Sequence, residues 1–449
     1  MSEAVPPRWT RAWWSGVTPT PTLRAAALLG ALGAGVWFAP MTVPFWAPVL
    51  LVAVAVGVDS WLVPSPWRLA MDRELPGVVG LGGDAEVVWR VHNATGRRVS
   101  VAVADDLPPS LGADRRRFSV VVPPRARRRV AATLHPSRRG TFRPSVLTVR
   151  VTGPLGLGQR QADRDLPGRV EVHPSFRSRA AAELRVRRHR VLEEGLRAIR
   201  ARGGGTQFEA LRDYVEGDDV RRVDWAATAR AGHPVVRTYR AERNQQVLAL
   251  LDAGRLSAGL VDGVPRLDHA MDAVLALTTI ASRSGDRTGL VVFGTEVRAT
   301  VPARNDRGQL RRLSTAMHAV EPELAESDYR EAFRTALSRF RRQATLVLFT
   351  ELGAEAVQES LLPALPLLIR DHAVIVASVR DPAVEEARDQ DPTRSTDVYR
   401  AAAAVTVLHE RERAAAQLRA MGVQVVDALP SELAGRVGDA YLETKARGR

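Results

Sequence analysis

An uncharged, apolar run from Ala25 to Val58 constrains this chain more than any other feature of its sequence. The run is too long for one straight span, and prolines interrupt it at positions 40, 44 and 48. Division near these prolines gives two segments, residues 23–39 and 42–62, each near the lower limit of the ~17–25 residues that a bilayer core requires. The sequence therefore predicts a transmembrane helical hairpin over residues 23–63.

The residues that flank this run predict its orientation. Aromatic side chains would lie where the spans meet an interface: Trp37, Phe38, Phe45 and Trp46 near the turn, and Trp61 and Trp67 at the other end. Arginines flank the uncharged run at positions 8, 11, 24, 68 and 73, and the turn carries no charge. The positive-inside rule therefore places both ends, including a tail over residues 1–22, in the cytoplasm. We expect a multi-pass protein of the cell membrane with cytoplasmic soluble domains.

A signal peptide is the competing interpretation of the N-terminus, with Arg8, Arg11 and Arg24 as its basic region. It predicts one apolar stretch of about 7–15 residues followed by a small-residue cleavage site. A second apolar segment follows directly in this sequence, which favours the hairpin.

The length and composition predict folded modules. A chain of 449 residues is too long for one ordinary core, so two or three domains are expected. Hydrophobic residues make up 45% and charged residues 25%, which argues against wholesale disorder. The net charge of +14 comes almost entirely from arginines interleaved with 50 acidic residues, a spread that argues against a nucleic-acid groove. The absence of cysteine excludes disulfides, thiol catalysis and cysteine-ligated metals.

Residues 72–175 consist of short β-branched segments at close spacing, separated by turns rich in Pro and Gly. The segments run over 85–93, 97–107, 117–124, 127–136, 145–151 and 168–174. Alternation with this spacing predicts an all-β sandwich of the immunoglobulin-like type. The sequence has no Cys…Trp…Cys signature, so the prediction concerns architecture alone.

Residues 246–449 change to strands that alternate with longer helical segments. Strands are predicted at 247–252, 288–294, 297–302, 345–350, 373–379 and 423–429, and helices at 267–285, 308–320, 329–340, after Glu355 and at 398–421. Continuous Val/Leu/Ile strands between helices predict a mostly parallel sheet covered on both faces, a doubly wound, Rossmann-like α/β domain.

Residues 176–245 connect these two parts. Their first half is basic, has a helical pattern and ends in three glycines at positions 203–205. These glycines lack the preceding strand and the following Lys-Ser/Thr of a phosphate-binding loop, so they predict a flexible stop or a helix C-cap.

Polar residues after the predicted strands are arranged as in a von Willebrand factor A-type (vWA) domain. In such domains a D-x-S-x-S loop, a Thr and an Asp hold one Mg²⁺ at the carboxyl edge of the sheet. The corresponding positions here are Asp252, Gly254, Ser257, Ser327, Asp328 and Glu351. Gly254 and Leu256 replace both serines of the loop, and Arg255 could itself neutralise Asp252. We therefore expect a degenerate, metal-free scaffold without a cofactor; a working metal site is the alternative.

The stretch LRDYVEGDDVRRVDWAATAR over residues 211–230 mixes acids, arginines, one Tyr and one Trp too closely for an amphipathic pattern. Its candidate positions are Arg212, Tyr214, Gly217, Asp218, Asp219, Arg221, Asp224, Trp225, Arg230 and, further on, Arg237. We interpret this motif either as an internal clasp across the α/β sheet or as a recognition surface for another protein.

Local chemistry predicts how this motif folds. Gly217 would allow a tight turn, and Asp218 or Asp219 would cap a helix over residues 220–232. Arg221 and Asp224 would share one face of that helix, and Trp225 could point at neighbouring strands.

With a second motif, this stretch makes the chain resemble the DUF58 family over nearly its whole length. The second motif comprises Arg138-Arg-Gly140, Gly153-Pro-Leu-Gly-Leu157 and Val172-His-Pro174. Members of the family usually accompany a MoxR-type AAA+ ATPase, which is taken to remodel or load partners through vWA-containing proteins. The resemblance implies a membrane-tethered adaptor for such an ATPase, in envelope-related assembly or stress tolerance.

Sequence chemistry by itself predicts a membrane-anchored binding module that is not an enzyme and has no small-molecule or nucleic-acid partner. No Ser/His/Asp spacing stands out, and the nine histidines are scattered. The alternative function is a metal-dependent ligand-binding receptor facing outward, which needs the opposite topology and a working cation site. A membrane-associated hydrolase would need a nucleophile that the sequence does not show, and nucleic-acid binding would reveal itself by steep salt dependence.

Overall fold

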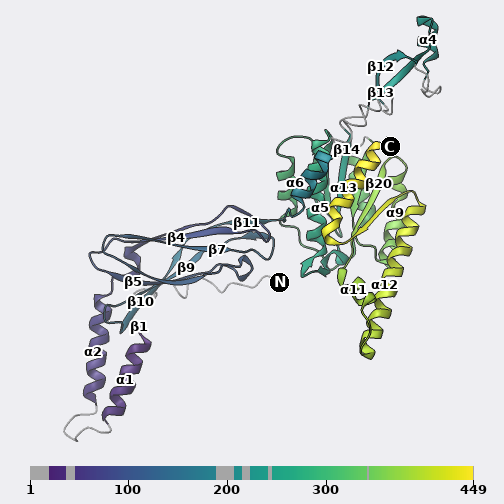
Figure 1. Cartoon of the computed structure of the whole chain (residues 1–449). Helices are drawn as coiled ribbons and strands as arrows, with labels where there is room; N and C mark the ends of the chain where they lie inside the picture. The colour runs from purple at the N-terminus through teal and green to yellow at the C-terminus, as the bar shows by residue number, and fades with distance from the viewer. Residues whose placement is uncertain are drawn as a thin grey trace. The chain divides into compact units, whose positions relative to one another are not determined.

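The computed structural model describes residues 20–36, 46–188, 207–214, 223–240, 245–340 and 343–447. The chain divides into two compact units, Met1–His173 and Pro174–Arg449. Figure 1 labels their helices and strands.

Two apolar helices open the first unit. Helix α1 spans Leu23–Val36 and α2 spans Trp46–Leu62, and the two pack side by side (Figure 1). Among the described residues, one stretch, Val49–Arg68, is long and apolar enough to cross a membrane. Helix α1 has 14 residues, about 21 Å of helix, which is shorter than a bilayer core of about 30 Å. The turn with Trp37, Phe38 and Phe45 lies outside the described residues.

The rest of this unit is β-structure. Its strands are β1 (Thr20–Pro21), β2 (Leu69–Glu74), β3 (Val78–Gly80), β4 (Ala85–Asn93), β5 (Val99–Asp105), β6 (Arg117–Val122), β7 (Arg127–Leu134), β8 (Gly140–Phe142), β9 (Val146–Thr152), β10 (Gly158–Asp165) and β11 (Val170–His173). They form a five-stranded sheet β1-β10-β9-β5-β6 and two three-stranded sheets, β2-β4-β7 and β3-β11-β8. Every strand segment predicted between residues 85 and 174 is present.

One core joins these sheets, because alternate residues of each strand point inward. Trp89 of β4 is fully buried, and its indole Nε1 donates a 2.6 Å hydrogen bond to Asp105 of β5. Asp105 also forms a 2.5 Å ion pair with Arg73 of β2. This buried triad ties the strands of two sheets together.

The turn between β9 and β10 is hydrogen-bonded to a buried carboxylate of helix α2. Asp59 of α2 accepts hydrogen bonds from the backbone N–H groups of Leu155, Leu157 and Gly158 at 2.8–2.9 Å. A Cβ on Gly153 would overlap the Asp59 carboxylate. The Gly153-Pro-Leu-Gly-Leu157 motif therefore has a structural role, since it encloses the last turn of an apolar helix.

The second unit contains a six-stranded sheet in the order β18-β17-β14-β19-β20-β21. Its strands are β14 (Gln246–Asp252), β17 (Arg287–Phe293), β18 (Val297–Arg304), β19 (Ala344–Phe349), β20 (Ala373–Val379) and β21 (Gln424–Ala428). All neighbours run parallel except β17 and β18, which form an antiparallel pair at one edge. The mostly parallel sheet that the sequence predicts is confirmed.

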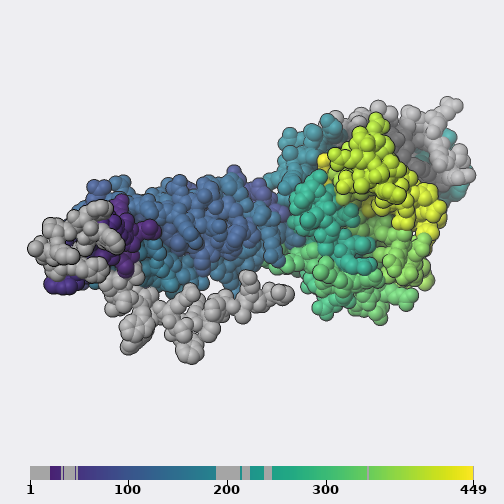
Figure 2. All heavy atoms as spheres, turned by 90° about the horizontal axis from the view of Figure 1, so that it is seen from below, coloured from purple at the N-terminus to yellow at the C-terminus, as the bar shows by residue number. Residues whose placement is uncertain are grey.

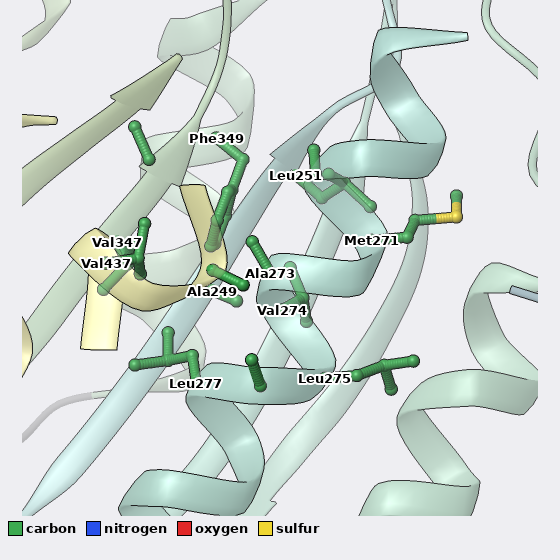
Figure 3. Packing of buried hydrophobic residues seen from close by; sticks show 14 of the residues in the cluster. Ala249, Leu251, Met271, Ala273, Val274, Leu275, Leu277, Val347, Phe349 and Val437 are labelled. Carbon is green, nitrogen blue, oxygen red and sulfur yellow. The ribbon is translucent and has the colours of Figure 1, made fainter. Parts of the chain in front are cut away.

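Helices cover both faces of this sheet. They are α5 (Arg266–Arg283), α6 (Gln309–Met317), α7 (Tyr329–Arg339), the short α8 (Ala354–Ala356), α9 (Leu362–Ala364) and α10 (Pro366–Ile369), α11 (Pro382–Asp389), α12 (Ser395–Ala420) and α13 (Pro430–Ala446). One core lies under α5 and α13, where Leu251, Val347 and Phe349 meet Val274 and Val437 (Figure 3). A second core on the opposite face lies under α7 and α12.

The C-terminal helix α13 is fixed by the single lysine of the chain. Lys445 forms a 2.5 Å ion pair with the fully buried Asp286 and donates a hydrogen bond to the Ser284 carbonyl. The Tyr441 hydroxyl also donates to Asp286. Two side chains therefore converge on one buried carboxylate.

The start of the predicted connector packs on this α/β unit. Residues 179–188 are helical, and Ala182 and Val186 belong to the core under α5 and α13. Asp272 of α5 accepts a 3.2 Å hydrogen bond from the Ser178 N–H, and Arg185 forms a 3.2 Å ion pair with Asp439 of α13. The three glycines at positions 203–205 lie outside the described residues.

Candidate functional site

The described part of the arginine-rich motif is a β-hairpin that carries a short helix. Strands β12 (Gln207–Asp213) and β13 (Val235–Arg240) pair antiparallel, and α4 (Trp225–Ala231) lies between them in the sequence. The Tyr214 N–H donates to the Pro234 carbonyl at 2.9 Å, and Val223 forms an isolated bridge with Val236. The strands were not predicted from the sequence.

Asp224 caps helix α4. Its backbone is extended (φ −83°, ψ 96°), and its carboxylate accepts a 3.0 Å hydrogen bond from the Ala227 N–H. The prediction that Asp218 or Asp219 caps the helix is therefore wrong. An Asp in the capping position lies outside the helix, so it cannot share a helical face with Arg221 as expected. The predicted end is confirmed, because Gly232 closes the helix with a left-handed backbone (φ 75°).

The side chain of Trp225 lies at the surface of this motif. It is 69% exposed, whereas Ala227, in the same helix, is buried. The expectation that Trp225 points at neighbouring strands is wrong for this reason. Arg230 is exposed as well and donates from Nε to the Ala226 carbonyl at 3.1 Å.

Other predicted motif residues lie beyond what the structure describes. Gly217, Asp218, Asp219 and Arg221 fall in residues 215–222, and the side chains of Arg212 and Arg237 are likewise undescribed, although their backbones pair in β12 and β13.

A second cluster lies at the carboxyl edge of the parallel sheet, around Asp252. This residue ends β14 and is 5% exposed. Its Oδ1 accepts from the Gly254 N–H at 2.9 Å and from the Ser327 hydroxyl. Its Oδ2 accepts from the Tyr329 hydroxyl at 2.9 Å and the Thr350 hydroxyl at 2.6 Å. The carboxylate is thus fully hydrogen-bonded within the chain.

Tyr329 holds its proton in this cluster. Burial, and then the negative charge of Asp252, raise the pKa of Tyr329 well above its usual value near 10. The ring lies edge-on to Phe293 with centroids 5.6 Å apart. A pocket of about 20 Å³ beside Asp252, lined in part by Ser327 and Tyr329, has room for about one water molecule.

Glu351 follows the adjacent strand β19 at the same edge of the sheet and faces arginines. It is 4% exposed, and its Oε2 lies 3.2 Å from Arg411 of α12 and 3.5 Å from Arg266 of α5. Arg411 also forms a 2.6 Å ion pair with Asp427 of β21. Burial raises the pKa of Glu351, and the two guanidinium groups oppose that shift. The result is a buried ion-pair network that joins α5, α12 and the sheet.

The other predicted positions of a vWA metal site have local structural roles. The Ser257 hydroxyl donates to the Asp252 carbonyl at 2.7 Å. Asp328 caps α7 by accepting a 2.9 Å hydrogen bond from the Glu331 N–H. The sequence suggested that Arg255 could neutralise Asp252. Arg255 instead forms a 3.1 Å ion pair with Glu326.

These donors fit a divalent cation poorly. Mg²⁺ needs near-octahedral oxygen ligands at about 2.0–2.1 Å, but Asp252 already binds four protein donors, and Glu351 is directed at Arg266 and Arg411. Within the described residues, no group of three His, Cys, Asp or Glu side chains could hold a metal ion.

Sequence reasoning found part of this edge and missed the rest. It named Asp252, Ser327 and Glu351, and the structure brings the first two into contact. It missed Tyr329, Thr350 and Arg411. The first two could have been found, since each lies directly beside a position named for the cation site.

The fold and this edge define a multidomain α/β protein whose second unit has a mostly parallel sheet with polar residues gathered where the strands end. Residues 210–413 match the model of the family described as "Protein of unknown function DUF58". The resemblance expected from the sequence motifs is confirmed over these residues.

Relatives and solved structures add the following similarities. Two uncharacterized proteins, one of Mycobacterium bovis (strain ATCC BAA-935 / AF2122/97) and one of Mycobacterium tuberculosis (strain ATCC 25618 / H37Rv), are each 38% identical over 108 residues, which is 23% of this chain and 33% of each relative. The match thus spans about a third of the relatives' length.

Among solved structures, the chain is similar to the conserved hypothetical protein BatB from Bacteroides thetaiotaomicron (15% identity, TM-score 0.30, covering 46% of this chain and 100% of that one). It is also similar to the vWF domain of the type V pili tip protein Mfa5 from Porphyromonas gingivalis (14% identity, TM-score 0.22, covering 25% and 39%).

Proposed function

We propose that the protein is a membrane-anchored, non-enzymatic adaptor that binds another protein through the surface around Trp225. The observation that carries this proposal is the 69% exposure of Trp225 in the motif by which the chain resembles its family. A large exposed aromatic is costly to leave in water, and Trp is enriched among the residues that dominate protein interfaces.

The apolar N-terminal helices support the anchoring part of the proposal. Leu50, Leu51, Val54 and Trp61 of α2 are each more than half exposed. Exposed apolar side chains along one helix favour a lipid environment over water. We propose that α1 and α2 form a membrane hairpin, that the β-unit is an immunoglobulin-like sandwich beside the membrane, and that both units are cytoplasmic.

The partner we propose is a MoxR-type AAA+ ATPase, with a role in envelope-related assembly or stress tolerance. This step rests on the family resemblance. The hydrogen-bonded Asp252 and the paired Glu351 support an adaptor over a reaction centre, because neither carboxylate is directed at open space.

A binding measurement with a matched variant tests the proposal. The detergent-solubilised chain is titrated with a purified MoxR-type ATPase from the same organism, and Trp225→Ala is compared with Leu324→Ala, since Leu324 is 85% exposed outside the motif. Loss of a Trp anchor costs about 2 kcal/mol or more, a roughly 30-fold weaker Kd. Equal Kd values for the two variants would refute the Trp225 surface.

The alternative function, an outward-facing metal-dependent receptor, is tested by calorimetry with Mg²⁺ and Mn²⁺. The hydrogen bonds around Asp252 predict no binding at micromolar concentration. Micromolar binding that disappears in Asp252→Ala would favour the receptor instead.

A further inference from the structure

Strand β21 has an open edge. It pairs with β20 on one side, and no other strand within residues 245–340 and 343–447 pairs with it. The Ala428 carbonyl accepts a 2.7 Å hydrogen bond from the Arg380 N–H on the β20 side. Because successive residues of a strand point their backbone groups to opposite sides, Val425 and Asp427 direct theirs away from β20. The Asp427 carbonyl also accepts a 3.1 Å hydrogen bond from the Arg380 guanidinium.

A cavity of about 310 Å³ lies along this edge. Residues 424–427 of β21 line one side of the cavity. Four residues of α13, which we call the α13 stripe, line another side: Arg436, Asp439, Ala440 and Glu443. The spacing of the stripe follows one helical face over two turns, about 10 Å. That length matches about three residues of an extended strand. Figure 2 shows residues of the C-terminal part of the chain, in yellow-green and yellow, at the surface of this unit.

The two ends of the α13 stripe carry opposite charges. Arg436 and Glu443 each have 58% of the side chain exposed, and each also pairs along α13, Arg436 with Glu432 at 2.8 Å and Glu443 with Arg447 at 3.8 Å. Gln424 contacts Glu443 at 3.3 Å, which places the negative end beside the start of β21 and the positive end toward its finish. Asp439, in the middle, is paired with Arg185 of its own chain. A polar stripe of this kind is complementary to itself when two copies lie antiparallel.

We propose that β21 pairs antiparallel with β21 of a second copy of this chain, about a two-fold axis at Val426. The Val425 C=O then accepts from the Asp427 N–H of the second copy, and the Val425 N–H donates to the Asp427 carbonyl as a second donor beside Arg380, so the two sheets become continuous. The same axis places Arg436 of one copy against Glu443 of the other, and the cavity gives these long side chains room. This dimer is independent of the ATPase docking proposed above, which uses the Trp225 surface.

Charge reversal tests the pairing on the full chain in detergent. Arg436→Glu and Glu443→Arg each place like charges across the axis, so each is expected to weaken dimerisation by about tenfold or more, as measured by sedimentation equilibrium. An equimolar mixture of the two variants restores both pairs and should dimerise about as well as the wild type. Arg388→Glu on α11, which is exposed and lies outside the cavity, is the control and should leave dimerisation unchanged.

Cross-linking tests the geometry without altering stability through charge. The chain contains no cysteine, so Arg436→Cys and Glu443→Cys each introduce a single thiol. A disulfide should form in a mixture of the two variants and not in either one alone. Three results would each overturn the proposal: a monomer at all concentrations, a dimer that neither charge reversal weakens, or a disulfide between two copies of the same variant. If an extended segment of another protein fills the cavity instead, the chain stays monomeric, which is the first of these results.

Discussion

At the scale of the residue, the Asp252 carboxylate accepts all its hydrogen bonds from donors of its own chain. Two hydroxyls, from Tyr329 and Thr350, converge on Oδ2. Tyr329→Phe removes one donor and leaves the packing against Phe293 in place. We expect a loss of about 1–3 kcal/mol in the free energy of unfolding, measured by urea denaturation. Tyr399→Phe is the matched control because Tyr399 is 77% exposed; equal losses in both variants would contradict a structural role for the Tyr329 hydroxyl.

Asp272 predicts a pH-dependent contribution to stability. Burial raises the pKa of this carboxyl above its ordinary value of 3.8, and the hydrogen bonds from Ser178 oppose that shift. A raised pKa in the folded state means that the contribution of Asp272 is fully present below pH 3.8 and is lost as the pH rises through the folded pKa. The stability of wild type relative to Asp272→Asn should therefore be greater at pH 4 than at pH 7.5 in chemical denaturation. A difference that grows toward pH 7.5 would be inconsistent with this sign.

The sequence predicts residues of the site only where a local pattern marks them. Asp252 and Ser327 follow from the vWA pattern, and Gly232 follows from helix-stop chemistry. The cap by Asp224 was misplaced because several acids in this stretch are equally suited to the role, and the true position depends on where β12 and β13 pair. Arg411 had no local signal, since only tertiary packing brings α12 to Glu351.

At the scale of the element, the turn between β9 and β10 holds α2 through the Asp59 carboxylate. Gly153→Ala would place a methyl group against the Asp59 carboxylate. We expect destabilisation of about 1–3 kcal/mol, seen as a lower Tm of the full chain in detergent. Gly77→Ala, where an added Cβ meets nothing within 4 Å, should have a much smaller effect. A Gly153→Ala variant as stable as Gly77→Ala would contradict this role of the turn.

Elements with a continuous apolar pattern were predicted well, and polar ones were missed. The buried strands β14, β17, β19 and β20 lie where the sequence places them. Strand β10, with the sequence GQRQADRD, alternates too weakly to be seen, because its backbone pairing with β9 is what makes it a strand. Strand β12, in the connector, was likewise not predicted, because its pairing with β13 determines its conformation.

At the scale of the whole molecule, the apolar face of α2 predicts membrane retention. The full chain should remain in the membrane fraction after alkaline carbonate extraction. Leu51→Arg with Val54→Arg places two charges in the candidate span, each costing about 2.5–3.5 kcal/mol in a helix centre, and should release much of the chain. Exposed positions in the β-unit, such as Val121→Arg, provide the control. Retention of the double variant would argue against α2 as the anchor.

The topology of the proposed anchor is open to a direct test. A C-terminal alkaline phosphatase fusion, active only outside the cytoplasm, should be inactive if arginines flanking the hairpin keep both ends inside. Strong phosphatase activity would reverse the orientation and favour the receptor alternative.

The buried ion pair between Lys445 and Asp286 protects the side-chain amine of the chain from amine-reactive reagents. The one lysine side chain is only 13% exposed, so acylating reagents will find little besides the N-terminal amine while α13 stays in place. Labelling of the Lys445 amine therefore reports local opening of the last helix, and the labelling rate measures how often α13 detaches from Asp286.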